Sequence, residues 1–135
     1  MDGFPNVINA LRASPGVLGV ETGETRSGKR VIFAWLTGKK ALIYWYHSDA
    51  HQKAMKAVYP RGDFEPYPLQ DLPENSGPIL AIVSVSFSGQ RIATIGIELY
   101  GPLPGGVAVG GRFAPEALEV RGLRRIDLGA AQRQE

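Results

Sequence analysis

Apolar residues along this 135-residue chain recur in two rhythms, one typical of helices and the other typical of strands. Val7, Ile8 and Leu11 share one side of a helix at this spacing, which predicts a short amphipathic helix over residues 6–13. A Ser-Pro-Gly triplet follows at residues 14–16, and proline and glycine there are expected to end the helix. The first element is therefore a short helix with one apolar side.

Two strands are predicted next, joined by a polar turn. The β-branched residues of Val17–Glu24 favour a strand. Residues 25–28, Thr-Arg-Ser-Gly, suit a tight turn that ends in a glycine free to take positive φ. The second strand, Arg30–Leu36, is apolar on both faces, as in strands that are buried on both sides. This pattern predicts a hairpin whose second strand lies inside the sheet.

The segment after the hairpin predicts one kinked helix or two short ones. Thr37 is expected to cap a helix that begins at residues 39–40. Ser48, followed by an aspartate, offers a fresh N-cap in the middle of the helical pattern. The pattern continues to about Tyr59, and Pro60 ends it.

The second half of the chain predicts a long connection and a second hairpin. Proline recurs through the polar residues 61–78, which indicates an extended connection. Two strongly apolar strands follow over residues 79–87 and Arg91–Tyr100, separated by a Ser-Gly-Gln turn. Beyond them the pattern predicts a short strand at Val107–Val109, a helical turn from Pro115 and a frayed tail over residues 129–135.

The order helix, strand, strand, helix, strand, strand is typical of an α+β, ferredoxin-like antiparallel sheet that lacks its usual first strand. Helices are then expected on one face of the sheet. In that fold the first and last strands are neighbours, so Arg91–Tyr100 is expected to fill the vacant interior position, antiparallel to residues 79–87. The prediction is a permuted version of the fold, formed by residues 1–135 as a single domain.

Composition narrows the classes of protein to consider. Hydrophobic residues make up 44% and charged residues 21%, as in soluble globular proteins. The net charge is +2 without a basic cluster, so no nucleic-acid partner is expected. No apolar run approaches the roughly 20 residues that span a bilayer, so no membrane partner is expected. The chain has no cysteine and does not begin like a signal peptide, and we expect a cytoplasmic protein.

The segments SPGVLGVETG and VIFAWLTGKKALIYWYHSDAHQKAM resemble the dimeric α/β-barrel superfamily, most closely its antibiotic biosynthesis monooxygenase-like branch. The resemblance covers about the first 59 residues. The chain departs from the family in lacking the first strand and in its long segment after Ser76. The positions that carry the resemblance are Pro15, Gly16, Trp35, Trp45, Tyr46, Ser48, His51, Ala54 and Met55.

The resemblance implies a homodimer that acts on, or binds, a small molecule. The family includes cofactor-free oxygenases, heme-degrading enzymes and stress proteins. For a cofactor-free oxygenase, it implies His51 as the catalytic base or as the residue that orients an aromatic substrate. Trp35 and Tyr44 are then expected as pocket walls, and His47 as a further substrate-binding residue. The positive end of the helix that starts at Ser48 is expected to lower the pKa of His51 and keep the ring neutral.

Simpler roles for the same residues stay open. His51 also suits a capping or packing role at the helix start behind Ser48, and no partner acid for a catalytic histidine is identifiable. The aromatic residues suit a core or a dimer interface. His47 and His51 are four residues apart, but Ser48 breaks the helix between them and no HExxH pattern exists, so no metal is expected. We expect no cofactor; heme would need an axial histidine facing a roomy cavity. A non-catalytic ligand-binding or structural dimer is therefore the alternative function.

A sheet covered by helices on one face leaves its other face apolar, and a second copy is the expected cover. The protein should therefore be a dimer in dilute buffer. Light scattering at micromolar concentration checks this prediction, and a mass near 14.6 kDa would contradict it.

Overall fold

A computed structural model describes residues 4–62, 64–109 and 122–126. The helices and strands follow one another as α1 (Phe4–Ala13), β1 (Val17–Glu24), β2 (Arg30–Leu36), α2 (Lys39–His47), α3 (Asp49–Val58), β3 (Ile79–Ser88), β4 (Arg91–Tyr100), β5 (Val107–Val109) and β6 (Arg124–Ile126). Their bounds agree closely with the predicted ones, except that β6 was not predicted. The helical turn expected from Pro115 and the tail over residues 129–135 lie outside the described residues. None of the described helices is long and apolar enough to cross a membrane.

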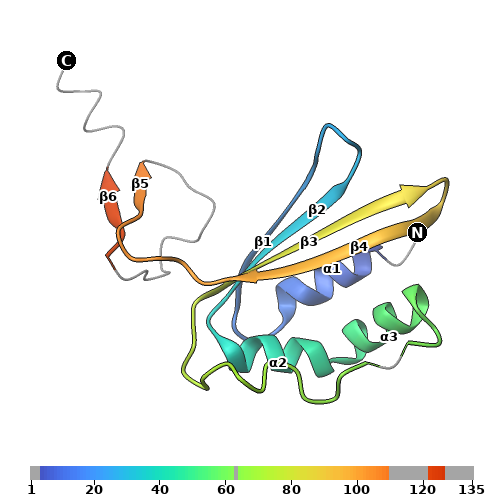
Figure 1. Ribbon diagram of the computed structural model, residues 1–135, viewed down its shortest axis with the longest axis horizontal. Coiled ribbons are helices and arrows are strands. Elements are labelled where there is room, and N and C mark those ends of the chain that lie inside the picture. The colour runs from blue at the N-terminus through green and yellow to red at the C-terminus, as the bar shows by residue number, and fades with distance from the viewer. Residues whose placement is uncertain (1–3, 63, 110–121, 127–135) are drawn as a thin grey trace.

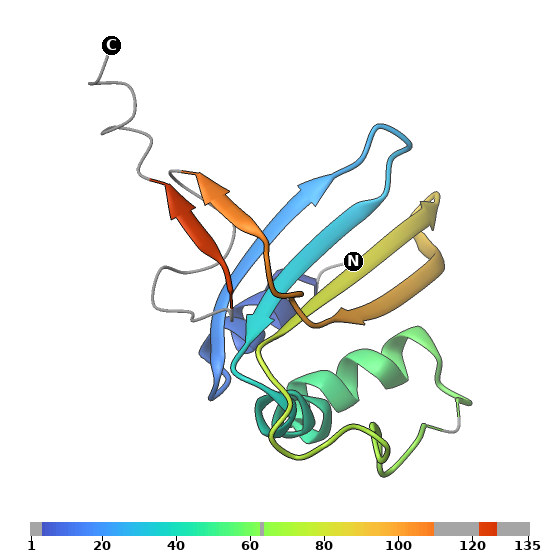
Figure 2. The same cartoon turned by 60° about the vertical axis from the view of Figure 1, so that its left-hand side comes forward.

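Four strands form the main sheet in the order β1-β2-β3-β4, and each neighbouring pair is antiparallel. Figure 2 shows the four strands side by side in this order. The helices lie beneath the sheet in Figure 1. A separate parallel pair joins β5 and β6. The α+β class with an antiparallel sheet is therefore confirmed, and the arrangement is compatible with a ferredoxin-like fold.

The position of β4 differs from the predicted one. It is antiparallel to β3, as expected, but it lies at the edge of the sheet and not in the interior. The connection after α3 brings β3 directly beside β2, with Ala81 opposite Ala34, so no interior slot is left to fill. The tight turn after Ser88 then holds β4 against the outer side of β3. The expected interior placement of Arg91–Tyr100 is therefore wrong.

The hydrophobic core lies between the helices and the first three strands. Leu36 and Val85 are the largest side chains that are fully buried. Partly buried residues of α1, β1, α3 and β3 pack around the central cluster. No residue of β4 belongs to it among the described residues. The buried members of the cluster are Leu11, Ile32, Ala34, Leu36, Ala41, Trp45 and Ala81.

The apolar side chains of β4 on the helix side of the sheet are left uncovered. Leu99, Ile97 and Ile95 lie opposite Ala81, Val83 and Val85 of β3, so they share the face on which the core is built. Their exposed fractions are 38%, 59% and 46%. We call Ile95, Ile97 and Leu99 the β4 row. The helices therefore cover the apolar face only as far as β3.

The predicted break between two helices is confirmed at Ser48, which ends α2 and begins α3. The Ser48 hydroxyl accepts a hydrogen bond from the His51 backbone N–H at 3.2 Å, as an N-cap does. The start of α2 differs from the prediction. Its cap position is Gly38, without a side-chain hydrogen bond, so Thr37 does not cap it. A backbone bond from the Lys39 N–H to the Ser76 carbonyl at 2.9 Å satisfies this helix end instead.

Lys39 fixes the long connection to the start of α2. Its side chain is buried, and Nζ donates to the Leu72 carbonyl at 2.7 Å and to Glu74 Oε1 at 2.9 Å. The ammonium lowers the pKa of the Glu74 carboxyl, first through this hydrogen bond and then through its charge. A buried lysine needs such partners because an unpaired charge away from water is costly. Lys39 therefore ties α2 to a segment more than thirty residues later in the chain.

Replacing Lys39 with Met should lower the free energy of unfolding by about 1–3 kcal/mol, because the Leu72 carbonyl loses its buried donor. Glu74→Gln is the matched control: the exposed amide keeps an acceptor for Nζ, so its effect should be clearly smaller. Urea unfolding followed by circular dichroism measures both variants. Equal stability of Lys39→Met and the wild type would contradict an anchoring role.

Candidate functional site

His51 stands in the first turn of α3, and its ring is turned back toward α2. Nδ1 lies 2.9 Å from the Tyr46 carbonyl oxygen. A carbonyl only accepts hydrogen bonds, so Nδ1 carries the proton of this contact. In the neutral ring Nε2 then holds the free lone pair. This nitrogen is the atom of His51 that is able to accept a proton or a hydrogen bond from a ligand.

The same contact gives His51 a structural role. The Tyr46 carbonyl belongs to the last turn of α2, where carbonyls lack partners within the helix. It also accepts a hydrogen bond from Gln52 Nε2 at 2.8 Å. Two side chains of α3 therefore cap the end of α2 and hold the bend at Ser48. The capping role that the sequence left open for His51 is observed, although the residue it caps is in α2.

Aromatic rings surround the His51 imidazole. The centroid of the imidazole lies 5.5 Å from the ring centroid of Trp45 and 5.3 Å from the ring centroid of Tyr46. Burial lowers the pKa of His51, and the hydrogen bond to the Tyr46 carbonyl opposes this effect only in part. The lowered pKa agrees with the sequence-based expectation, but burial is its main cause. The ring is therefore held mainly neutral near neutral pH.

Trp35 lies on the other face of the sheet. It alternates along β2 with Ala34 and Leu36, which belong to the core between the sheet and the helices. Its partners across the sheet are Gly19 and Leu80. Because successive side chains of a strand point to opposite faces, Trp35 cannot border a pocket between the sheet and α3. The predicted grouping of Trp35 with His51 is not formed.

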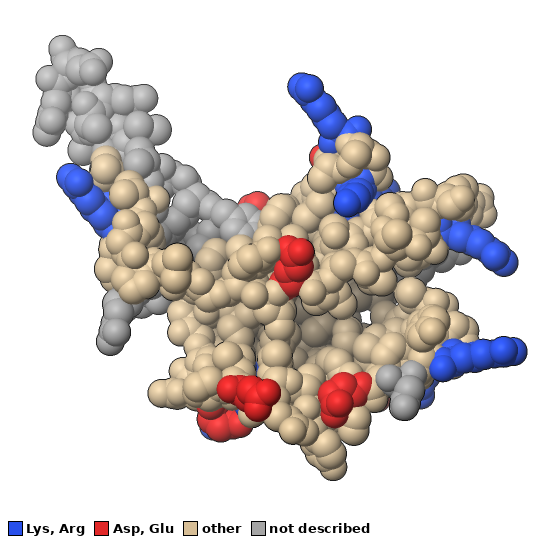
Figure 3. Space-filling view, in the orientation of Figure 1, with Lys and Arg blue, Asp and Glu red and all other residues tan. Residues whose placement is uncertain are grey.

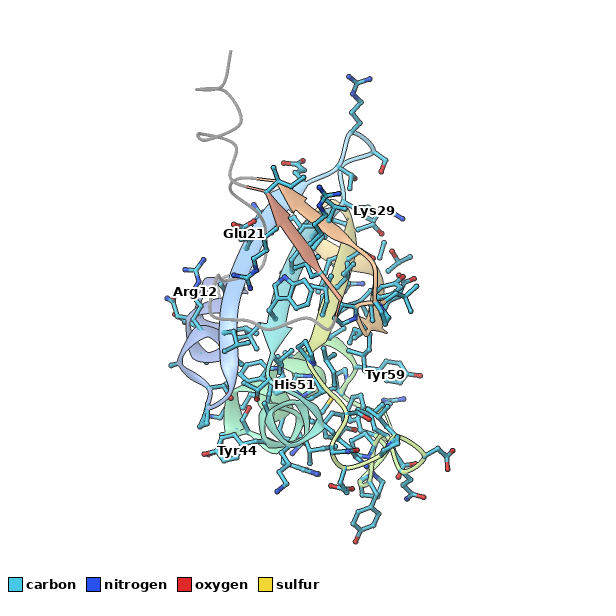
Figure 4. The ribbon with its side chains drawn as sticks, turned by 90° about the vertical axis from the view of Figure 1, so that its left-hand side faces the viewer. Arg12, Glu21, Lys29, Tyr44, His51 and Tyr59 are labelled. Atoms are coloured by element: carbon cyan, nitrogen blue, oxygen red, sulfur yellow. The ribbon has the colours of Figure 1, made fainter. Side chains whose placement is uncertain are left out.

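Tyr44 and His47 are exposed on α2, whereas His51 is partly buried at the start of α3. Tyr44 is 59% exposed and points outward from α2, whereas His51 lies between the helices and the sheet (Figure 4). His47 is exposed, and its ring meets the ring of Tyr46 edge-on at 5.2 Å. The substrate-binding roles of Trp35, Tyr44 and His47 therefore stay predictions, and the described contacts do not gather these residues around His51. Within the described ranges no cluster of three or more histidine and acidic side chains could hold a metal.

Two hollows of the surface are candidate ligand sites. The first, about 280 Å³ in volume, lies between α1 and the β1–β2 hairpin, away from all four predicted site residues. It is lined by Ile8, Thr22, Gly23, Glu24, Arg30 and Val31. The second is the groove between β4 and α3, which Figure 3 shows as a recess in the surface. Its strand wall is the β4 row, and exposed Val58 and Tyr59 stand at the end of α3.

The β4–α3 groove was missed by sequence reasoning because the row looks like an ordinary buried strand. The residues of β4 alternate much as those of β3 do, and each strand has four β-branched residues among its ten. Only the strand order decides that β3 is covered and β4 is not. The sequence indicates an uncovered strand in one way only: it predicts three short helices for four strands, which are too few to cover the whole face of the sheet.

Comparisons with family models, with curated proteins and with solved structures found no match.

The folded state lowers the pKa of His51 and so prefers the neutral ring, whereas the unfolded ring titrates near its ordinary value of 6.5. Stability from this group is complete above that value and falls as the pH drops below it, because the unfolded chain takes up the proton first. His51→Asn should keep a donor for the Tyr46 carbonyl and remove the titration. Its melting temperature should fall less between pH 7.5 and pH 5.5 than that of the wild type, measured by calorimetry. An equal fall in the melting temperatures of the variant and the wild type would contradict this contribution of His51 to the pH dependence of stability.

Proposed function

We propose that this protein binds a small, largely apolar aromatic molecule in the β4–α3 groove. The observation that carries the proposal is the exposed β4 row, on a face that is otherwise packed as core. Ligand sites are typically apolar hollows with a few well-placed polar groups. An apolar wall at the edge of the core, facing a helix across a recess, meets the first of these conditions.

His51 supplies the polar group in this proposal. Its ring packs against Trp45, which belongs to the same core cluster as Ala81. Ala81 lies opposite Leu99 of the β4 row. This chain of neighbours supports a position for His51 toward the Leu99 end of the groove. Nε2 then accepts a hydrogen bond from a hydroxyl group of the ligand, while Nδ1 stays engaged with the Tyr46 carbonyl.

The catalytic form of the proposal follows the resemblance to the monooxygenase-like dimeric α/β barrels. Neutral Nε2 takes the proton of a hydroxyl group on an electron-rich aromatic substrate, and the resulting carbanion adds dioxygen, the oxidant of the step, without a cofactor. The imidazolium returns the proton to the peroxide, and loss of water from this hydroperoxide leaves a quinone. The lowered pKa of His51 supports the neutral ring that a base requires. In this form the protein is a homodimer in the cytoplasm, and Trp35, Tyr44 and His47 have no direct part in binding.

A non-catalytic ligand-binding or structural dimer is the second candidate. One observation favours it: His51 and Gln52 both cap the Tyr46 carbonyl, so the histidine has a complete structural role without any substrate. Oxygen consumption with a dihydroxynaphthalene as probe separates the two candidates. Loss of this consumption in His51→Asn supports catalysis, and its absence in the wild type supports the non-catalytic dimer.

Titration calorimetry with naphthol and with naphthalene tests the groove. Ile97→Asn should weaken both probes strongly, because it places a polar group in the apolar wall. Leu103→Asn is the matched control at an exposed apolar residue outside β4, and it should leave both affinities unchanged. His51→Asn should weaken naphthol by about three- to tenfold, the value of one hydrogen bond, and leave naphthalene unaffected.

Failure of both probes to bind the wild type, or equal effects of Ile97→Asn and Leu103→Asn, would rule out the groove. Weaker naphthalene binding in His51→Asn would mean that this residue shapes the site and does not contact the hydroxyl.

A further inference from the structure

The outer edge of β4 is a long strand edge without a partner among the described residues. β4 runs over Arg91–Tyr100, and the sheet order places β3 on one side of it and no described strand on the other. Such an edge presents backbone N–H and C=O groups that are ready to pair with another strand. Pairing of this kind needs no special side chains, but it leaves the choice of partner to the side chains that flank the edge.

The edge has few of the features that natural proteins use to prevent strand addition. Its sequence, RIATIGIELY, contains neither proline nor lysine. A bulge interrupts its pairing with β3 only near the start, between the Ser86 and Phe87 pairs. From Thr94 to Tyr100 the strand is regular. The β4 row adds exposed apolar side chains along this regular part, which a neighbouring strand would partly cover.

We propose that two copies of this chain pair edge to edge along β4, antiparallel, about a two-fold axis that passes beside Ile95. The partner is a second copy because the edge is self-complementary in this register. Ile95 then faces its own counterpart on the helix side of the sheet. With the bulge taken up at Ala93, Ile92 faces Ile97 of the second copy. The apolar side chains of the helix side thus meet one another across the axis.

Charge complementarity selects this register. Arg91 lies opposite Ser88 and Glu98 lies opposite Ile82, which places both on the helix-free face of the sheet. In the proposed register Arg91 of each copy faces Glu98 of the other, so the symmetry forms the pair twice. The Tyr100 hydroxyl already donates to Glu98 and orients its carboxylate. A two-fold axis at Gly96 would instead place Glu98 opposite Thr94 and leave Arg91 without the opposite charge.

The pairing joins the two sheets into one, and it brings the two β4 rows together between the two α3 helices. Each groove then continues into that of the second copy, so the proposed ligand site is incomplete in a single chain. This inference replaces the face-to-face dimer expected from the sequence with an edge-to-edge one. It rests on the homodimer of the proposed function, not on the ligand. Because the apolar row and the charge pair lie on opposite faces, each can be changed without touching the other.

The chain has no cysteine, so a single introduced cysteine reports contact directly. Directly opposed residues of antiparallel strands have Cα atoms about 4.5–5.5 Å apart, within the range that a disulfide spans. Ile95→Cys should therefore form a covalent dimer under mild oxidation. Tyr59→Cys is the matched control, at an aromatic residue that is 63% exposed on the end of α3, and it should remain uncrosslinked.

The charge pair is tested by light scattering and sedimentation of the full chain. Arg91→Glu and Glu98→Arg should each weaken dimerisation by about tenfold, because each creates two like-charge contacts. The double variant should restore the wild-type affinity. A wild-type mass near 14.6 kDa would overturn the homodimer and this inference together. A stable dimer without an Ile95→Cys crosslink, or with no response to the charge variants, would overturn the edge pairing and leave the homodimer standing.

Discussion

The apolar helix-side face of the sheet is wider than the helices that cover it. Strands β1 to β3 contribute to the core that the three helices cover, whereas β4 continues the same face without cover. An apolar strand face that stays in contact with water contributes no burial energy to the stability of the folded protein. A ligand in the groove, a second copy at the edge, or both together would reduce the apolar surface of β4 that is exposed to water. The proposed function and the proposed assembly therefore come from one imbalance in the fold.

Two sets of hydrogen bonds fix α2, α3 and the connection that follows them to one another. At the bend, Ser48 caps α3 while His51 and Gln52 cap the end of α2. At the other end of α2, Lys39 holds the connection that leads from α3 back to β3. The Tyr46 hydroxyl donates to the Glu65 carbonyl and ties the middle of that connection to the helix. The groove is therefore bordered by fixed elements, as a preformed ligand site requires.

Local structure was predictable from the sequence because short-range chemistry determines it. The bounds of Val17–Glu24 and Arg30–Leu36 followed from β-branched residues and turn glycines, and the helix break followed from the capping chemistry of Ser48. Long-range pairing was not predictable in the same way. Nothing near Lys39 in the sequence signals acceptors more than thirty residues away. The predicted site failed at Trp35 because a strand of apolar residues on both faces does not reveal which face the helices take.

The proposed function places the ligand against the β4 row and not in the hollow between α1 and the β1–β2 hairpin. Methyl NMR of the isoleucine, leucine and valine side chains during a titration with naphthol tests it most directly. A ligand bound in the β4–α3 groove should give saturable shifts that centre on Ile95, Ile97 and Leu99 of β4. Shifts centred instead on Ile8 and Val31, which line the hollow between α1 and the β1–β2 hairpin, would contradict it.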